Sequence, residues 1–182
     1  MKKFILFAAI LFAGVSVVKA QTAITDQATL NVKLNPLLSI TVNNASKTVN
    51  LEYATDANYK DGVGADQVNQ DHLSVTSTGG FLIKVEAADL TATSGTKSMP
   101  ASSILIKAEA GTANPLTGAV PVSERSLSNS AVNLIESNFG GTNKTFNVTF
   151  TGAKDDLYAD NYIVGGVATT YTTTVLYTIT AQ

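Results

Sequence analysis

Aspartates recur at intervals of five residues early in the chain: Asp56, Asp61, Asp66 and Asp71. Oxygen-rich loops can bind calcium, which takes about six to eight oxygen ligands. Asp56, Asn58 and Asp61 resemble the start of such a loop, but Lys60 stands where another oxygen ligand is needed and no glutamate closes the loop. A solvated acidic loop is therefore the favoured interpretation. Calcium stays open as the one candidate ligand, and no other cofactor is expected.

Other chemistry-bearing residues are too few for a catalytic site. His72 is the only histidine, and there is no cysteine, so neither a histidine cluster nor a thiol site can form. Glu52, Glu86 and Glu109 fall on expected strands, but nothing in their spacing pairs two of them as a glycoside-cleaving site requires. We expect no enzyme, and we interpret His72 as a structural residue at a strand edge or turn.

The overall composition excludes further classes of protein. Of the 182 residues, 45% are hydrophobic and 14% are charged, which is too apolar for a disordered chain. The formal net charge is −2 and no basic cluster is present, which argues against a nucleic-acid partner. Abundant threonine and valine suit the pleated surface of β-strands.

Residues 1–20 have the pattern of a secretory signal peptide. Lys2 and Lys3 precede an apolar run of 15 residues, Phe4–Val18, and small residues stand before Gln21. The run is short for a membrane span, which needs about 20 residues, and no later stretch is longer. Cleavage leaves nine basic and fourteen acidic residues, a net charge of −5. We expect an exported protein without a membrane span after signal removal, found in the periplasm, at the cell surface or outside the cell, as part of a fimbrium.

Most of the remaining chain alternates with a period of two, which is typical of half-buried strands. Expected strands cover residues 28–34, 37–42, 48–53, 72–78, 81–87, 103–108, 145–151 and 171–180. Gly79–Gly80 separates two of them and predicts a tight hairpin. Leu127–Phe139 fits either a short helix or an irregular strand. The prediction is an all-β, immunoglobulin-like antiparallel sandwich of about seven or eight strands.

Both ends of the mature chain carry alternating strands. Ala28, Leu30, Val32 and Leu34 share one face of a segment within residues 21–35, which precede the domain at 36–182. Val175, Tyr177 and Ile179 share one face of the last strand. An edge strand exposes unpaired N–H and C=O groups, so strands at both termini make strand exchange between subunits easy.

At these ends the sequence resembles subunits of chaperone–usher pili, especially the archaic type, and related spore-coat-U-like domains. The resemblance rests on Ala28–Val42 (ATLNVKLNPLLSITV) and Gly165–Thr180 (GGVATTYTTTVLYTIT). That family usually has a cysteine in the strand after its donor segment, where this chain has Ser39. The resemblance is therefore to a cysteine-free relative.

The resemblance implies a mechanism of assembly. A pilin sandwich lacks its last strand; a periplasmic chaperone fills the space, and an usher-guided subunit then replaces the chaperone with its own N-terminal strand. By this analogy, the donor side chains are Ala28, Leu30, Val32 and Leu34. The accepting edge is formed by Val175, Tyr177 and Ile179. The expected partners are identical or related subunits, in a fimbria-like polymer.

Two alternatives remain open. In a closed sandwich, residues 28–34 pair within their own chain, and their alternation reflects core burial only. The other alternative is a secreted binding module for a glycan, the cell wall or calcium, with its site in the acidic loop at residues 54–71.

Overall fold

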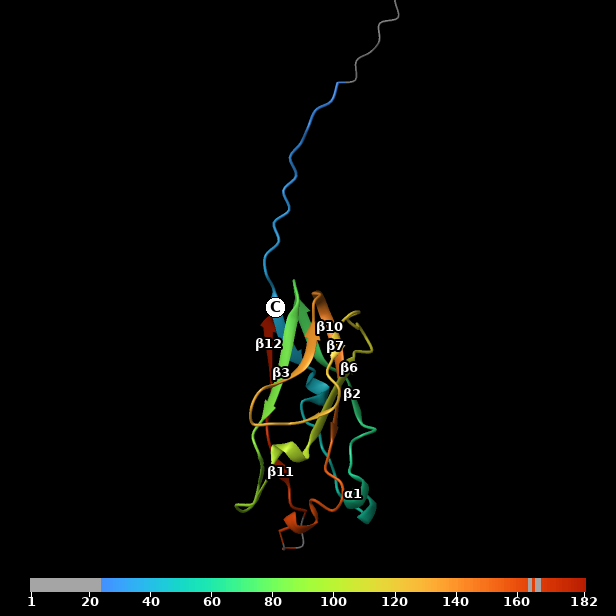
Figure 1. The fold of residues 1–182 in the computed structure, drawn as a ribbon, viewed down its shortest axis with the longest axis vertical. Coiled ribbons are helices and arrows are strands. Elements are labelled where there is room, and N and C mark those ends of the chain that lie inside the picture. Colours follow the sequence, from blue (N-terminus) through green and yellow to red (C-terminus); the bar gives the residue numbers. More distant parts are fainter. Residues whose placement is uncertain (1–23, 164, 166–167) are drawn as a thin grey trace, which may run out of the picture. The chain divides into compact units, whose positions relative to one another are not determined.

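The computed structural model describes residues 24–163, 165 and 168–182. The expected signal peptide lies outside these residues. The chain divides after Lys33, and the unit Leu34–Gln182 contains every described helix and strand (Figure 1). No helix among the described residues is long and apolar enough to cross a membrane.

The unit Leu34–Gln182 is an antiparallel β-sandwich. The first sheet has the order β1 (Leu38–Val42), β2 (Val68–Ser77), β10 (Gly141–Thr151), β6 (Leu105–Ala110) and β8 (Arg125–Ser126). The second has the order β12 (Val175–Ala181), β3 (Phe81–Ala87), β9 (Val132–Ser137) and β7 (Val120–Pro121). A small third sheet contains β11 (Tyr171–Thr172), β4 (Leu90–Ala92) and β5 (Ser98–Met99). The predicted all-β sandwich is confirmed.

Helices are short and lie in the connections. They are η1 (Asn44–Ser46), α1 (Asp56–Asp61), η2 (Ala101–Ser103) and η3 (Ala159–Asn161). Helix α1 begins with a capping box, in which the Thr55 side chain accepts from the Asn58 N–H and the Asn58 side chain accepts from the Thr55 N–H.

Alternating side chains from both sheets build the core. On β3, residues Phe81, Ile83, Val85 and Ala87 are buried, whereas the residues between them are partly exposed. Facing strands add buried aromatic and aliphatic side chains, including Leu73, Ile106, Leu134, Ile135 and Phe146. On β3, burial therefore alternates with the period of two that is typical of a half-buried strand.

The predicted hairpin at Gly79–Gly80 is wrong. β2 and β3 belong to different sheets and do not pair, so this turn carries the chain from one layer to the other. Both strands bury one face in the same core, a pattern that is identical for a hairpin and for a connection between layers. Gly140, in the neighbouring β9–β10 turn, passes so close that a Cβ there would lie 2.3 Å from the Ser77 carbonyl oxygen.

Two other expectations need correction or resolution. Residues 48–53 form no strand, although Val49 and Leu51 pack against the core as their alternation predicts. The segment Leu127–Phe139, left open between helix and strand, contains strand β9.

Candidate functional site

The last strand of the sandwich, β12, lies at an edge of its sheet. It pairs with β3 on one side only, in a register from Val175 opposite Ala87 to Ala181 opposite Phe81. Val175, Tyr177 and Ile179, the predicted accepting residues, are half-buried and pack against the core. Leu176 points to the other face and is 52% exposed.

Backbone groups on one side of β12 have no partner among the described residues. The Gln182 N–H donates to the Gly80 carbonyl at 3.0 Å, which fixes the residues that pair with β3. Because successive residues of an antiparallel ladder face opposite sides, the N–H and C=O groups of Val175, Tyr177 and Ile179 point away from β3. The residues with inward side chains thus carry the free backbone groups.

Strand β1 forms the corresponding edge of the other sheet. The Thr78 N–H donates to the Leu37 carbonyl at 3.0 Å, and the Asn43 N–H donates to the His72 carbonyl at 2.8 Å. By the same alternation, Leu38, Ile40 and Val42 direct their backbone groups away from β2. Ile40 and Val42 also pack against the core.

These two edges lie beside each other, with Cα atoms of β1 and β12 within 8 Å, but they are not paired (Figure 1). We call Leu38–Val42 together with Val175–Ala181 the β1–β12 seam. The strands run in opposite directions, since β1 is antiparallel to β2 and β12 is antiparallel to β3. The seam thus has two rows of backbone N–H and C=O groups, one on each strand, that are unpaired among the described residues. The same residues direct their apolar side chains toward the core.

A polar contact joins the two sheets beneath the seam. His72 on β2 is buried; its Nε2 lies 3.1 Å from the Tyr177 hydroxyl, and its Nδ1 lies 2.9 Å from Ser46 Oγ in η1. Burial lowers the pKa of His72 and raises the pKa of Tyr177. The expectation of a structural histidine at an edge or turn therefore misplaced it: His72 lies in the interior.

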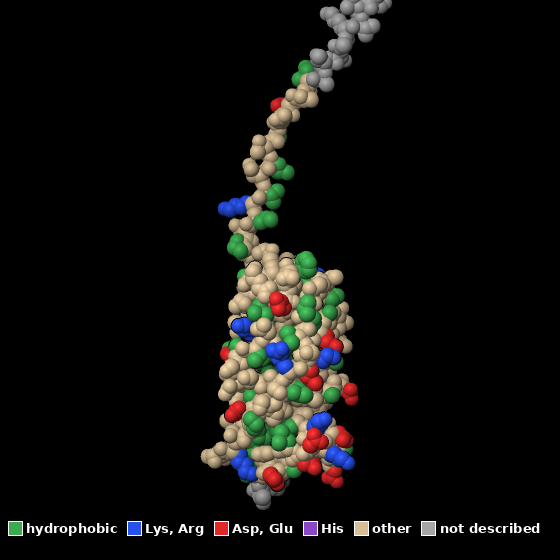
Figure 2. Space-filling model, in the orientation of Figure 1, with side chains coloured by type: hydrophobic (Ala, Val, Ile, Leu, Met, Phe, Trp, Pro, Cys, Tyr) green, Lys and Arg blue, Asp and Glu red, His purple; other side chains and the backbone are tan. Residues whose placement is uncertain are grey.

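The predicted donor residues precede the sandwich. Residues 24–37 form no strand, and Ala28, Leu30, Val32 and Leu34 are all exposed. The exposed fractions of Leu30, Val32 and Leu34 are 88%, 75% and 86%. Figure 2 shows hydrophobic side chains along this segment. Such exposure is unusual for regularly alternating apolar residues.

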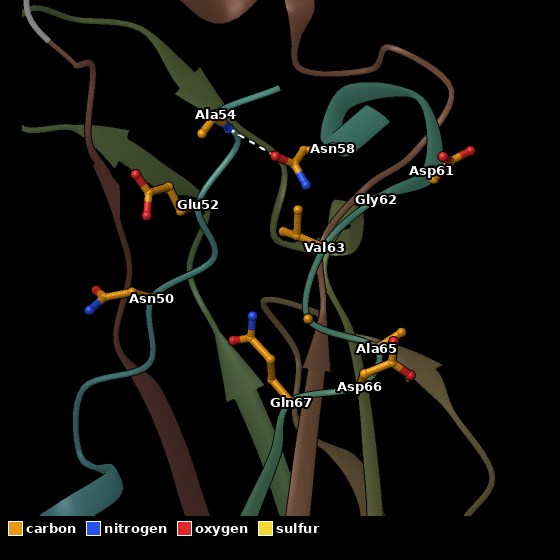
Figure 3. Close-up of a pocket in the computed structure, with 11 residues that line it drawn as sticks. Asn50, Glu52, Ala54, Asn58, Asp61, Gly62, Val63, Ala65, Asp66 and Gln67 are labelled. Atoms are coloured by element: carbon orange, nitrogen blue, oxygen red, sulfur yellow. Dashed lines mark hydrogen bonds between the residues drawn. The ribbon is translucent and has the colours of Figure 1, made fainter. Parts of the chain in front are cut away.

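The three candidate calcium ligands do not converge. Asn58 Oδ1 accepts from the N–H groups of Ala54 and Thr55, so the amide is occupied in capping α1 (Figure 3). Asn58 and Asp61 line a polar hollow of about 700 Å³, whereas Asp56 lines a different one. In the part of the chain described, no three His, Cys, Asp or Glu residues are grouped to hold a metal ion. The calcium hypothesis stays a prediction.

Comparison with known proteins adds no identity: no protein-family model and no curated protein sequence matches this chain.

Proposed function

We propose that this protein is the structural subunit of an extracellular fibre, which assembles when residues 28–34 of one molecule pair with the β1–β12 seam of another. One observation carries the proposal. The same molecule has an exposed alternating segment and, elsewhere, two adjacent strand edges whose free backbone groups lie above apolar side chains. Strand addition uses these complementary features, with main-chain bonds giving affinity and side-chain pockets giving register.

The magnitude of apolar burial is sufficient for a stable contact. Burying Leu30, Val32 and Leu34 contributes about 1.5–3 kcal/mol each, or about 5–9 kcal/mol together. Main-chain hydrogen bonds add to this value, and ordering the segment subtracts from it. Such a contact suits a polymer of a chain without cysteine, because no disulfide can join its subunits.

The proposal includes transient partners. An unpaired strand edge invites uncontrolled pairing, so a chaperone in the periplasm would cover the seam before assembly and an usher would guide the exchange. These partners follow from the resemblance to pilus subunits, together with the export signal expected at residues 1–20.

The test compares the exported protein with a version lacking residues 21–34. Electrophoresis in SDS without boiling should show a ladder of oligomers for the intact protein and a monomer for the truncated one. An added peptide of residues 28–34 should bind the truncated protein and raise its stability. A monomeric intact protein, together with a truncated protein that folds unaided and gains nothing from the peptide, would show that the proposal is wrong.

A matched pair of variants distinguishes specific strand pairing from non-specific hydrophobic association of the N-terminal segment. Leu30→Asp places a charge on the face that would be buried, and it should abolish the ladder. Asn31→Asp adds the same charge on the opposite face and should leave the ladder intact. Equal loss in both variants would contradict pairing through the alternating face.

A further inference from the structure

Residues 28–34 could pair with the free edge of β12 either in their own molecule or in a second molecule. The direction of the added strand differs between these two cases. Leu37 is hydrogen-bonded to Thr78 and Gln182 to Gly80, so β1 begins and β12 ends at the same end of the sandwich, beside the β2–β3 turn. A segment that folds back from Leu34 into its own molecule must run toward that end, parallel to β12. If a segment from a second molecule paired parallel to β12, the sandwich of that molecule would lie at the end beside the β2–β3 turn. The N-terminal segment of the accepting molecule emerges at the same end. A head-to-tail fibre therefore requires an antiparallel segment.

Folding back with all of residues 28–34 paired requires a reversal within Asn35–Pro36–Leu37. A two-residue loop would place Leu34 opposite Leu37 and Lys33 opposite Leu38. Because Leu38 lies on the same face of β1 as Ile40 and Val42, this register turns Lys33 toward the core and Leu34 away from it. A type I′ turn would also need positive φ at Pro36, which proline cannot adopt, and a type II′ turn would need it at Asn35, where glycine is preferred.

A three-residue loop restores the correct face, since Leu34 then lies opposite Leu38, but it conflicts with the residues present. This loop is a type I turn followed by a left-handed residue. Pro36 would occupy the second central position, where proline is disfavoured. Leu37 would be left-handed, at a cost of about 1–2 kcal/mol. In the structure, Leu37 is instead fixed to Thr78, which bonds its carbonyl at 3.0 Å and, through Oγ1, its N–H at 3.1 Å.

We infer that Asn35–Pro36–Leu37 prevents residues 28–34 from filling the seam of their own molecule and so directs them to β12 of a second copy of this chain. This inference rests on the proposed function and specifies its partner and register. Residues 28–34 and 175–181 both span seven positions, with four on the inward face. Only one antiparallel register pairs all four: Ala28 opposite Ala181, through to Leu34 opposite Val175.

The position of the nearest acidic side chain on the outer face differs between the two directions. Leu176 lies opposite Glu86 of β3, and Thr180 lies opposite Leu82. In the antiparallel register, Lys33 joins the row of Leu176 and Glu86. In the parallel register, Lys33 would instead join the row of Thr180, Leu82 and Glu136. Both directions therefore place Lys33 in a row with a glutamate, and that glutamate is one strand nearer in the antiparallel register.

Disulfide mapping can measure the register without background, because the chain has no cysteine. In the antiparallel register, Thr29 faces Thr180 in a non-hydrogen-bonded pair, whose Cα spacing of about 4.5 Å permits a disulfide. Oxidation of the variant Thr29→Cys with Thr180→Cys should give a covalent ladder that survives boiling. The matched control, Thr29→Cys with Thr178→Cys, is displaced by two residues on the same face and should give little ladder.

A second experiment changes the loop so that residues 28–34 can fold back on their own molecule. Pro36→Asn with Leu37→Gly provides residues suited to a three-residue loop, whereas Pro36→Ala with Leu37→Ala removes the same side chains without a glycine. The glycine variant should become largely monomeric. In it, Thr29→Cys with Leu176→Cys, the parallel pair, should form a disulfide within one chain. The alanine variant should still polymerise.

The outcomes separate this inference from the proposed function. If the unaltered loop gives oligomers but the disulfide joins Thr29→Cys to Leu176→Cys within one chain, the inference is wrong. It is also wrong if the glycine variant polymerises as fully as the alanine variant, although strand exchange itself would then stand. If none of these proteins forms oligomers or disulfides, both the inference and the proposed function fail.

Discussion

At the scale of single residues, His72 and Tyr177 connect the two sheets beneath the seam. Tyr177 comes from the edge strand β12, and its hydroxyl reaches a histidine on the opposite sheet at 3.1 Å. A buried polar atom without its partner is costly, so this contact holds β12 in place while leaving its outer backbone free. The Tyr177 side chain therefore contributes both to the stability of the folded chain and to the position of the β12 edge.

Removing the Tyr177 hydroxyl tests this contact. Tyr177→Phe keeps the ring but leaves His72 Nε2 without a partner among the described residues, so we expect a loss of about 1–3 kcal/mol in the free energy of unfolding. Urea denaturation of the protein lacking residues 21–34 measures this change without interference from assembly. Tyr162→Phe, at a side chain that is 44% exposed, should change stability little. Equal effects in both variants would argue against the contact.

The buried histidine also predicts a dependence on pH. Burial lowers the pKa of His72 below its ordinary value of 6.5, and the partners of its ring, Ser46 and Tyr177, are uncharged. Because the folded state disfavours the protonated ring, this contribution to stability is complete above pH 6.5. It declines as the pH falls from there toward the lowered pKa and is constant below it.

Urea denaturation at about pH 7.5 and about pH 5.5 should therefore show a loss of stability in the unaltered protein and a smaller loss in His72→Gln. A variant that loses as much stability as the unaltered protein would show that other groups cause the dependence.

At the scale of elements, the backbone of β12 is paired with β3 on one side and faces the seam on the other. Its ladder with β3 uses the backbone of alternate residues and leaves the N–H of Ile179 facing the seam. Proline is tolerated in an edge strand when its missing N–H lies on the free side. Substitution at residue 179 therefore distinguishes pairing within the subunit from pairing between subunits.

Ile179→Pro removes one N–H from the free edge, and Ile179→Ala shortens the side chain but keeps that N–H. We expect oligomer formation to fall much further in the proline variant, while the two truncated monomers show similar urea midpoints. Sedimentation velocity measures the oligomers. Equal assembly of the two variants would show that the free backbone of β12 takes no part.

Sequence patterns identified the buried faces of strands better than they identified which strands pair with each other. Alternation correctly placed Val175, Tyr177 and Ile179 on one face of β12, because burial follows directly from side-chain periodicity. It could not show that β2 and β3 lie in different sheets, or that residues 48–53 pack against the core without a ladder. Both depend on contacts far apart in sequence.

Individual side chains show the same division. Asp56 and Asn58 suggested a calcium loop by spacing alone, but the helical turn of α1 assigns the Asn58 side chain to capping. The burial of His72 could be predicted only by knowing that β12 crosses above it. Its position beside Leu73, at the start of an alternating strand, gave no such signal.

At the scale of the whole molecule, the proposed assembly would explain both the low charge and the free strand edges. Monomeric β-proteins protect their edges with charged residues, prolines or covering loops. The faces of β12 carry no charged residue at all from Val175 to Ala181. An exported fibre subunit would use such an edge, whereas a secreted monomer would be prone to aggregate through it.

Amide hydrogen exchange, followed by mass spectrometry in dilute monomer and in assembled protein, tests strand addition most directly. In the monomer, residues 28–34 should exchange rapidly, and the seam-facing amides of 175–181 should exchange faster than those paired with β3. Assembly should protect both segments together, and Leu30→Asp should abolish both effects. Oligomers in which residues 28–34 still exchange rapidly would contradict assembly by strand addition.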